Sequence, residues 1–208
     1  MDRGNGALAA FVSLLPTLTR GCDEVFQLLP EKVQAHLRAV TPSHASHRTL
    51  GFGGGCHWCT EAVFDHLRGV HRVEQGFHRG DPPNGAWSEA ARVTWDPDAL
   101  PLPVLLEVHL RTHASTSAHS MRGKYRSAVY VGSEREAEEV RDALANLQAD
   151  FAKPLVTQVL PDRGFRPSEA RFQDYYRTDP ERPFCRTYID PKLAMLRREF
   201  GSHYRMSD

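Results

Sequence analysis

The sequence has no excess of charge of either sign. Its 208 residues include 26 lysine and arginine side chains and 26 aspartate and glutamate side chains, so the formal net charge is zero. Proteins that bind nucleic acids through the phosphate backbone carry a basic excess, and this chain has none. With 40% hydrophobic and 25% charged residues, it has the composition of a folded chain with a core, which excludes wholesale disorder.

Long hydrophobic runs are also missing. No apolar run reaches the ~18 residues that a membrane-spanning helix needs. The apolar stretch at residues 7–15 lacks the basic flank and the cleavage site of a secretory signal, and we interpret it as part of a helix. We therefore expect a cytoplasmic protein without a membrane partner. The balanced charge points to no charged partner, and a monomer is the default expectation.

Cysteine is scarce: the four residues are Cys22, Cys56, Cys59 and Cys185. This number is too small for a scaffold held together by disulfides. Cys56 and Cys59 form a Cys-x-x-Cys pair, which in a cytosolic protein indicates redox chemistry or a metal site before a structural disulfide. An inert pair in a glycine-rich turn remains a third interpretation, and we interpret Cys22 as structural.

Residues 1–46 are predicted to form an N-terminal helical extension and linker, in which Pro16 and Pro30 interrupt the helical spacing of apolar residues. Residues 47–208 are predicted to form the catalytic domain. Strands are expected at 48–52, 71–77, 90–95, 125–131 and 155–160, and helices at 57–67, 102–113, 133–151, 168–178 and 192–200. The order strand, helix, strand, strand, helix, strand predicts an α+β fold, a ferredoxin-like split βαβ sandwich.

The most informative segment is the glycine-rich turn that precedes Cys56. It places Cys56 between a strand and the first turn of a helix, where unpaired backbone N–H groups carry partial positive charge. A thiolate is stabilised there, so the pKa of Cys56 should lie below that of an ordinary thiol. Cys59 follows one helical turn later on the same face and can capture an oxidised Cys56 as a disulfide.

Zinc binding is the competing interpretation from a different class of protein. Cys56 and Cys59 would then act with histidines, notably His57, His109, His113 and His119. The later histidines have no standard zinc-ligand spacing, which favours redox chemistry.

Five blocks of sequence carry a family resemblance. The glycine-cysteine block resembles Gly-Cys-Phe-Trp-x-x-Glu, and residues 88–97 resemble Ala-Glu-Val-Val-x-Val-x-Tyr-Asp-Pro. Residues 124–130 resemble Gln-Tyr-Arg-Ser-Ala-Ile-Tyr, residues 165–176 resemble Phe-Tyr-Pro-Ala-Glu-Asp-Tyr-His-Gln-Asp-Tyr, and residues 183–193 resemble a Pro-Tyr-Cys tail. With these blocks in this order, the sequence resembles the peptide methionine sulfoxide reductases of the A type.

The resemblance implies a role for each matching residue. Cys56 matches the nucleophile, and Glu89 matches the carboxylic acid that protonates the sulfoxide oxygen. Tyr125 matches a tyrosine that holds this oxygen, and Trp58 matches an aromatic wall around the substrate methyl group. The sulfenic acid on Cys56 is then resolved as a disulfide, for which we favour Cys59 and keep Cys185 as the alternative.

Several positions depart from the family pattern around the substrate. His57 stands in place of a phenylalanine and could add charge near the Cys56 thiol, the loop at 80–87 is short, and Trp87 stands where a histidine is usual. Ser120 and Phe172 likewise replace an aspartate and a histidine. We count His57, Trp58, Phe77 and Trp87 as the candidate substrate-binding residues, and we expect a shifted substrate or affinity.

The implied function is reduction of methionine S-sulfoxide, free or in proteins, as repair after oxidative stress. The family takes its electrons from thioredoxin, so we expect a thioredoxin-like dithiol as partner and no bound cofactor. The alternative is a reductase of another small sulfoxide, or a general thiol-disulfide oxidoreductase, on the same fold.

Overall fold

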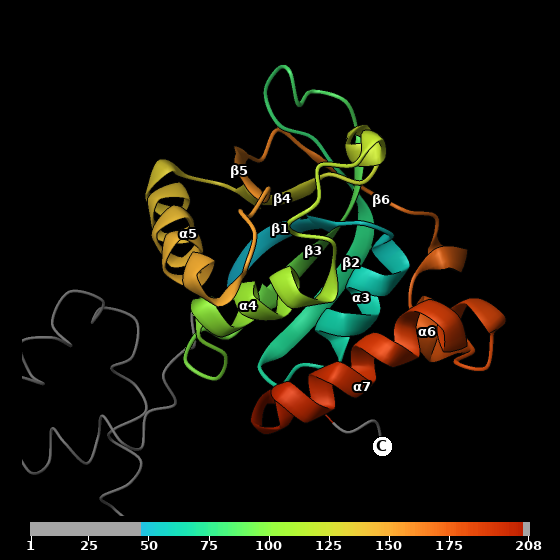
Figure 1. Cartoon of the computed structure of the whole chain (residues 1–208). Coiled ribbons are helices and arrows are strands. Elements are labelled where there is room, and N and C mark those ends of the chain that lie inside the picture. The colour runs from blue at the N-terminus through green and yellow to red at the C-terminus, as the bar shows by residue number, and fades with distance from the viewer. Residues whose placement is uncertain (1–46, 206–208) are drawn as a thin grey trace, which may run out of the picture. The chain divides into compact units, whose positions relative to one another are not determined.

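The computed structural model describes residues 47–205 (Figure 1). The predicted N-terminal extension, the apolar stretch at 7–15 and Cys22 lie outside these residues. No helix within residues 47–205 is long and apolar enough to cross a membrane.

The described chain alternates strands with helices from Arg48 onward. The strands are β1 (Arg48–Gly54), β2 (Val70–His78), β3 (Ser88–Trp95), β4 (Ser127–Val131), β5 (Gln158–Pro161) and β6 (Phe165–Pro167). The helices are α3 (His57–Asp65), α4 (Leu102–Thr112), α5 (Glu134–Leu147), α6 (Tyr175–Thr178) and α7 (Asp190–Glu199), and Cys185–Ile189 forms a π-helical turn before α7.

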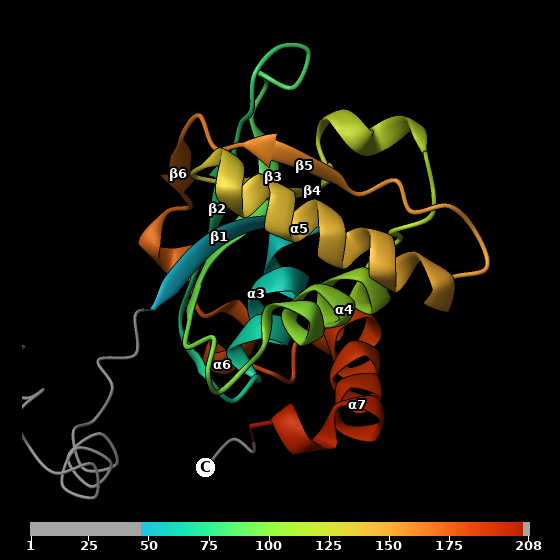
Figure 2. The same cartoon turned by 90° about the vertical axis from the view of Figure 1, so that its left-hand side faces the viewer.

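All six strands form one mixed sheet in the order β5-β4-β1-β3-β2-β6. Four neighbouring pairs are antiparallel, and β4 pairs with β5 in parallel. Helices α3 and α4 lie against the sheet with α7 alongside (Figure 1), and α5 covers the end that carries β4 and β5 (Figure 2). This arrangement confirms the predicted α+β class.

One face of the sheet carries the main core. Leu50 and Phe52 alternate with glycines along β1 and point into this core, where they meet apolar residues of α3, α4 and α5. The amphipathic pattern of α5 buries Ala137, Val140 and Leu144. Its N-terminus is capped by Ser133, whose hydroxyl accepts the Glu136 backbone N–H at 3.3 Å.

The element boundaries differ from the prediction mainly near the C-terminal half. Strand β4 begins at Ser127 rather than at residue 125, and β6 was not predicted, because three residues leave no readable alternation. The helix predicted over 168–178 is broken, because Asp174 adopts a left-handed conformation (φ 54°) before α6 begins.

Candidate active site

Cys56 lies at the point where β1 passes into α3. Gly55 makes the turn with φ 106°, a value that a side chain would strain. Cys56 itself is the N-cap of α3 with extended backbone angles, and its carbonyl accepts the N–H groups of Cys59 and Thr60 at 3.1 and 3.2 Å. The thiol is therefore placed at the helix N-terminus, as the sequence predicts.

The surroundings of Cys56 lower the pKa of its thiol. The main cause is a hydrogen bond from the Cys59 side chain, and the backbone N–H groups of Cys59 and Trp58 add to it, against burial and the charge of Glu89. The His57 ring lies beside this turn, with its Nδ1 3.0 Å from the Gly76 carbonyl oxygen and its Nε2 3.9 Å from Oε2 of Glu89.

Two further thiols lie beside Cys56. Cys59 is buried, and the hydrogen bond to Cys56 together with burial raises its pKa, so the charge of the pair belongs to Cys56. Cys185 is fully buried, and burial raises its pKa as well. Both belong to the apolar cluster against which Cys56 packs, and all three are free cysteines. The structure thus brings both candidate resolving residues to the same cluster.

Glu89 faces Cys56 from β3. It is 8% exposed, and its Oε2 accepts the backbone N–H of His57 at 3.2 Å. Its Oε1 lies 3.5 Å from the ammonium nitrogen of Lys124. We did not identify Lys124 as a candidate from the sequence, although its position directly before Tyr125 could have indicated it.

Tyr125 lies half-buried just before β4, next to Lys124. The Lys124 ammonium stands 4.9 Å from the Tyr125 ring centroid, and the Lys124 carbonyl accepts the Glu89 backbone N–H at 2.9 Å. Lys124 therefore links two residues that the sequence assigned to binding of an oxygen.

The aromatic wall is larger than predicted. The Trp58 ring stacks on Tyr175 with 4.0 Å between centroids and meets the Phe184 ring edge-on at 5.3 Å. On the other side, the His57 ring meets Phe77 edge-on at 5.3 Å. Tyr175 and Phe184 were missed because they lie over a hundred residues from Trp58, and only the density of aromatic residues in this region marked it.

Glu61 fixes the segment that carries Tyr175. This buried carboxyl accepts the backbone N–H groups of Asp174 and Tyr175 at 2.8 and 3.0 Å and the Gln75 side-chain amide at 3.1 Å. The sequence contained Glu61 in the quoted motif but gave no reason for it. Its role here is to tie α6 to α3 beneath the aromatic wall.

Trp87 lies farther out than the other candidates. Its ring packs 4.9 Å from the guanidinium carbon of Arg79 and 5.3 Å from that of Arg166. Arg166 in turn covers the Phe77 ring at 5.0 Å, so within the described residues Trp87 meets the site through Arg166.

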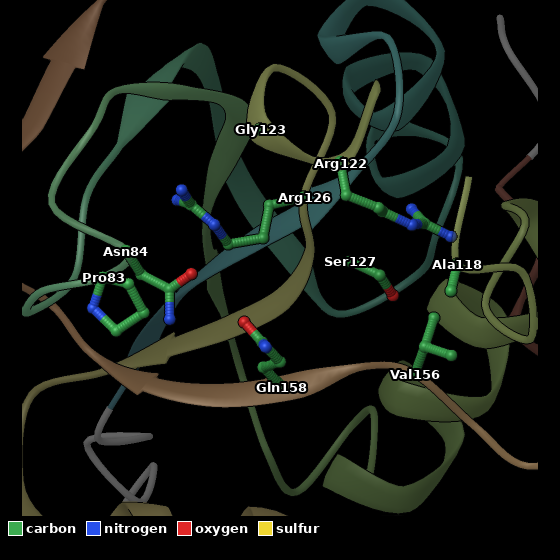
Figure 3. Close-up of a pocket in the computed structure, with 9 residues that line it drawn as sticks. All are labelled: Pro83, Asn84, Ala118, Arg122, Gly123, Arg126, Ser127, Val156 and Gln158. Atoms are coloured by element: carbon green, nitrogen blue, oxygen red, sulfur yellow. The ribbon is translucent and has the colours of Figure 1, made fainter. Parts of the chain in front are cut away.

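A separate hollow of about 320 Å³ opens beside the turn before Lys124 (Figure 3). Arg122 and Arg126 line it with side chains that extend in opposite directions, and Pro83 and Asn84 lie toward the Arg126 end. Neither Cys56 nor Glu89 lines it. It is therefore distinct from the thiol site.

Within residues 47–205, no group of three or more histidine, cysteine, aspartate or glutamate side chains is arranged to hold a metal ion. His109 in α4 and His113 at its C-terminal end instead pack against Gly54 of β1. His113 Nε2 lies 2.7 Å from the Ser127 hydroxyl. The described residues thus give the zinc interpretation no site.

A thiol of lowered pKa, a second thiol one turn away and a buried carboxyl define a thiol-based oxidoreductase site. Comparisons with known proteins specify the family. The family model "Peptide methionine sulfoxide reductase" matches residues 48–204. The chain is 33% identical over 188 residues to peptide methionine sulfoxide reductase MsrA of Deinococcus radiodurans, covering 83% of this chain and 91% of that protein.

A second relative, MsrA of Thermus thermophilus, is 35% identical over 73% of this chain and 94% of its own. The chain belongs to the peptide methionine sulfoxide reductase family. Among solved structures, yeast Mxr1 in reduced form superposes with a TM-score of 0.60 at 21% identity, covering 70% of this chain and 93% of that one. Methionine sulfoxide reductase A of Corynebacterium diphtheriae gives 0.56, covering 66% and 77%.

Proposed function

We propose that this protein reduces methionine S-sulfoxide, free or in proteins, to methionine. The observation that carries the proposal is the placement of the Cys56 thiol, with its lowered pKa, at the N-terminus of α3, while Glu89 binds the next N–H of the same turn. The relatives named MsrA support the same activity.

In the first half-reaction, the Cys56 thiolate attacks the sulfoxide sulfur while Glu89 supplies a proton to its oxygen. The oxygen ends on Cys56 as a sulfenic acid, and methionine leaves as the thioether. The substrate sulfur gains two electrons and the Cys56 sulfur loses two. We assign Tyr125 and Lys124 to hydrogen-bonding of this oxygen, and Trp58 with Tyr175 to an apolar wall for the methyl group.

In the second half-reaction, Cys59 attacks the Cys56 sulfenic acid, and the oxygen leaves as water. The pKa of Cys59 is raised chiefly by its bond to Cys56, so oxidation of Cys56 removes the main group that holds Cys59 protonated. Cys185, in the same cluster, is the alternative resolving residue or a relay. A dithiol then returns two electrons and two protons. Since yeast Mxr1 has been solved in complex with Trx2, we propose a thioredoxin as that dithiol.

Steady-state kinetics test the activity. We expect the full chain with dithiothreitol to reduce N-acetyl methionine S-sulfoxide and to leave the R epimer untouched, and Cys56→Ser to abolish turnover. Equal rates on both epimers would contradict the proposal.

A single turnover without reductant tests the resolving residue. We expect mass mapping to find a Cys56–Cys59 disulfide as the first product, and Cys185→Ser to form it at an unchanged rate. In Cys59→Ser, the sulfenic acid should persist long enough to be trapped by dimedone. A first product that joins Cys56 to Cys185 would assign resolution to Cys185.

One observation favours the alternative, a reductase of another small sulfoxide or a general thiol-disulfide oxidoreductase. His57 puts a polar imidazole, hydrogen-bonded to Gly76, where an apolar wall is expected. Dimethyl sulfoxide and a mixed disulfide serve as competing substrates: a higher kcat/KM on either than on methionine S-sulfoxide would establish the alternative.

Three further points belong to this proposal. Residues 47–208 form the catalytic domain, with the family match at 48–204 in support. Strands β4-β1-β3-β2, linked through α3 and α4, correspond to a ferredoxin-like split βαβ unit, to which β5 and β6 are added at the edges. We also propose a cytoplasmic location, which would keep the Cys56 and Cys59 thiols reduced between turnovers.

A further inference from the structure

Three cross-strand neighbours form a row on the sheet face that carries α3. Glu89 in β3 lies opposite Phe77 in β2, and Phe77 lies opposite Arg166 in β6. Directly opposite residues of antiparallel strands point to the same face, so Arg166 shares the face of the candidate active site. Since neighbouring strands lie about 4.8 Å apart, the backbone of Arg166 is about 10 Å from that of Glu89.

Arg166 is an exposed cation without a carboxylate partner. Within residues 47–205 it makes no ion pair, and its guanidinium contacts only the rings of Phe77 and Trp87, at 5.0 and 5.3 Å. Two other exposed arginines of this region are paired with carboxylates: Arg163 binds Asp81 at 2.8 Å, and Arg171 binds Glu169 at 3.0 Å. The N–H donors of Arg166 therefore remain available to a ligand.

A second guanidinium completes the patch. Arg79 packs on the Trp87 ring at 4.9 Å, and its Nε donates to the Arg163 carbonyl at 3.0 Å, which leaves its terminal nitrogens without a protein partner in the described chain. We name Arg79, Trp87 and Arg166 the Arg–Trp–Arg patch. Because the Trp87 ring packs against both guanidinium groups, the patch presents two oriented cations at the rim of the site.

We propose that the Arg–Trp–Arg patch is a subsite for a substrate carboxylate, so that this enzyme prefers methionine sulfoxide accompanied by an acidic group. This inference rests on the proposed function. Guanidinium groups bind carboxylates through two parallel hydrogen bonds, which suits a planar anion better than a neutral chain.

The reach of a peptide fits this subsite. His57 lies beside the thiol, and its ring centroid is 5.3 Å from that of Phe77. The guanidinium carbon of Arg166 is a further 5.0 Å from the Phe77 ring centroid. An extended peptide advances about 3.4 Å per residue, so an aspartate two or three positions from the oxidised methionine reaches Arg166. The α-carboxylate of free methionine sulfoxide is the other source of the same group.

Peptides that differ in one charge test the proposal. The full chain is assayed with dithiothreitol on acetylated and amidated peptides. Each peptide has methionine S-sulfoxide at its centre and Asp, Asn or Lys two positions to either side. We expect kcat/KM to be roughly two- to fivefold higher for the Asp peptide than for the Asn peptide, the range of an exposed ion pair, and lower still for the Lys peptide. The difference should lie in KM and shrink in 0.5 M salt.

Variants assign the effect to the patch. Arg166→Gln should remove the preference and Arg166→Glu should reverse it, each judged by the ratio of kcat/KM for the Asp peptide to kcat/KM for the Asn peptide within the same variant. Arg198→Gln removes one charge from an exposed arginine of α7 and should change nothing. Free methionine S-sulfoxide compared with its N-acetyl amide shows whether the α-carboxylate uses the same subsite, in which case Arg166→Gln removes that advantage too.

The two proposals fail differently. Equal kcat/KM for the Asp and Lys peptides, or a preference that survives in Arg166→Glu, overturns the carboxylate subsite. Absence of turnover with the neutral Asn peptide overturns the proposed function instead.

Discussion

At the scale of single residues, the surroundings shift the pKa values of buried groups most strongly. Cys56, Cys59 and Glu89 form the proposed reactive set, and each is held by contacts within one turn of α3 or across one strand. The same principle applies to histidines that the proposed reaction does not use. His113 at the C-terminal end of α4 packs against Gly54, and burial lowers its pKa from 6.5 to about 4.

This histidine predicts a pH-dependent stability. Between pH 6.5 and 4 the unfolded chain binds a proton at His113 and the folded chain does not, so folding stability falls as the pH falls through this window. Integrated over the window, the loss is about 3 kcal/mol. Urea unfolding at pH 7 and pH 4 measures it.

The matched variant is His113→Gln, which keeps a hydrogen-bonding side chain but does not titrate. We expect its free energy of unfolding to change less between the two pH values than that of the parent chain. An identical pH dependence in both proteins would exclude His113 as the source.

At the scale of elements, the pairing of β6 with β2 decides what lies at the rim of the site. The two strands approach closely at Gly76, where an added Cβ would stand 2.2 Å from the Arg166 carbonyl oxygen and 2.8 Å from the Pro167 Cα. Both atoms belong to backbone, so they cannot move without separating the strands.

We therefore expect Gly76→Ala to lower the free energy of unfolding by roughly 1–3 kcal/mol, the usual cost of overpacking. It should also increase hydrogen exchange of the β6 amides. Gly123→Ala is the control, because nothing lies within 4 Å of its added Cβ, and we expect it to leave stability within about 0.5 kcal/mol or raise it. Similar losses in both variants would contradict the close-approach argument.

At the scale of the whole molecule, the described chain contains a complete core. The main cluster of buried side chains runs from Leu50 in β1 to Tyr204 near the C-terminus. Since the helices and the sheet bury their apolar faces against one another within these residues, we expect residues 47–208 to fold alone.

Deleting residues 1–46 tests this expectation. The truncated chain should unfold in one cooperative transition with a Tm within about 3 °C of the full chain, a shift equivalent to about 1 kcal/mol. It should also keep its activity on N-acetyl methionine S-sulfoxide with dithiothreitol. A chain that is expressed only in aggregated form would show that the extension is part of the core.

The sequence alone determined the features that depend on neighbouring residues. The glycines and the Cys-x-x-Cys spacing placed Cys56 at a helix N-terminus with Cys59 one turn later, because strand, turn and helix signals all lie within about ten residues. The order of elements likewise determined the α+β class.

Only the tertiary structure decided which distant residues meet this thiol. That Glu89 binds the His57 N–H, that Tyr175 stacks on Trp58 and that Arg166 lies beside Phe77 all depend on strand register and on how α6 is tied to α3. A register shift of one residue would turn each strand side chain to the other face. Local patterns cannot specify this, because register is fixed by the packing of the whole core.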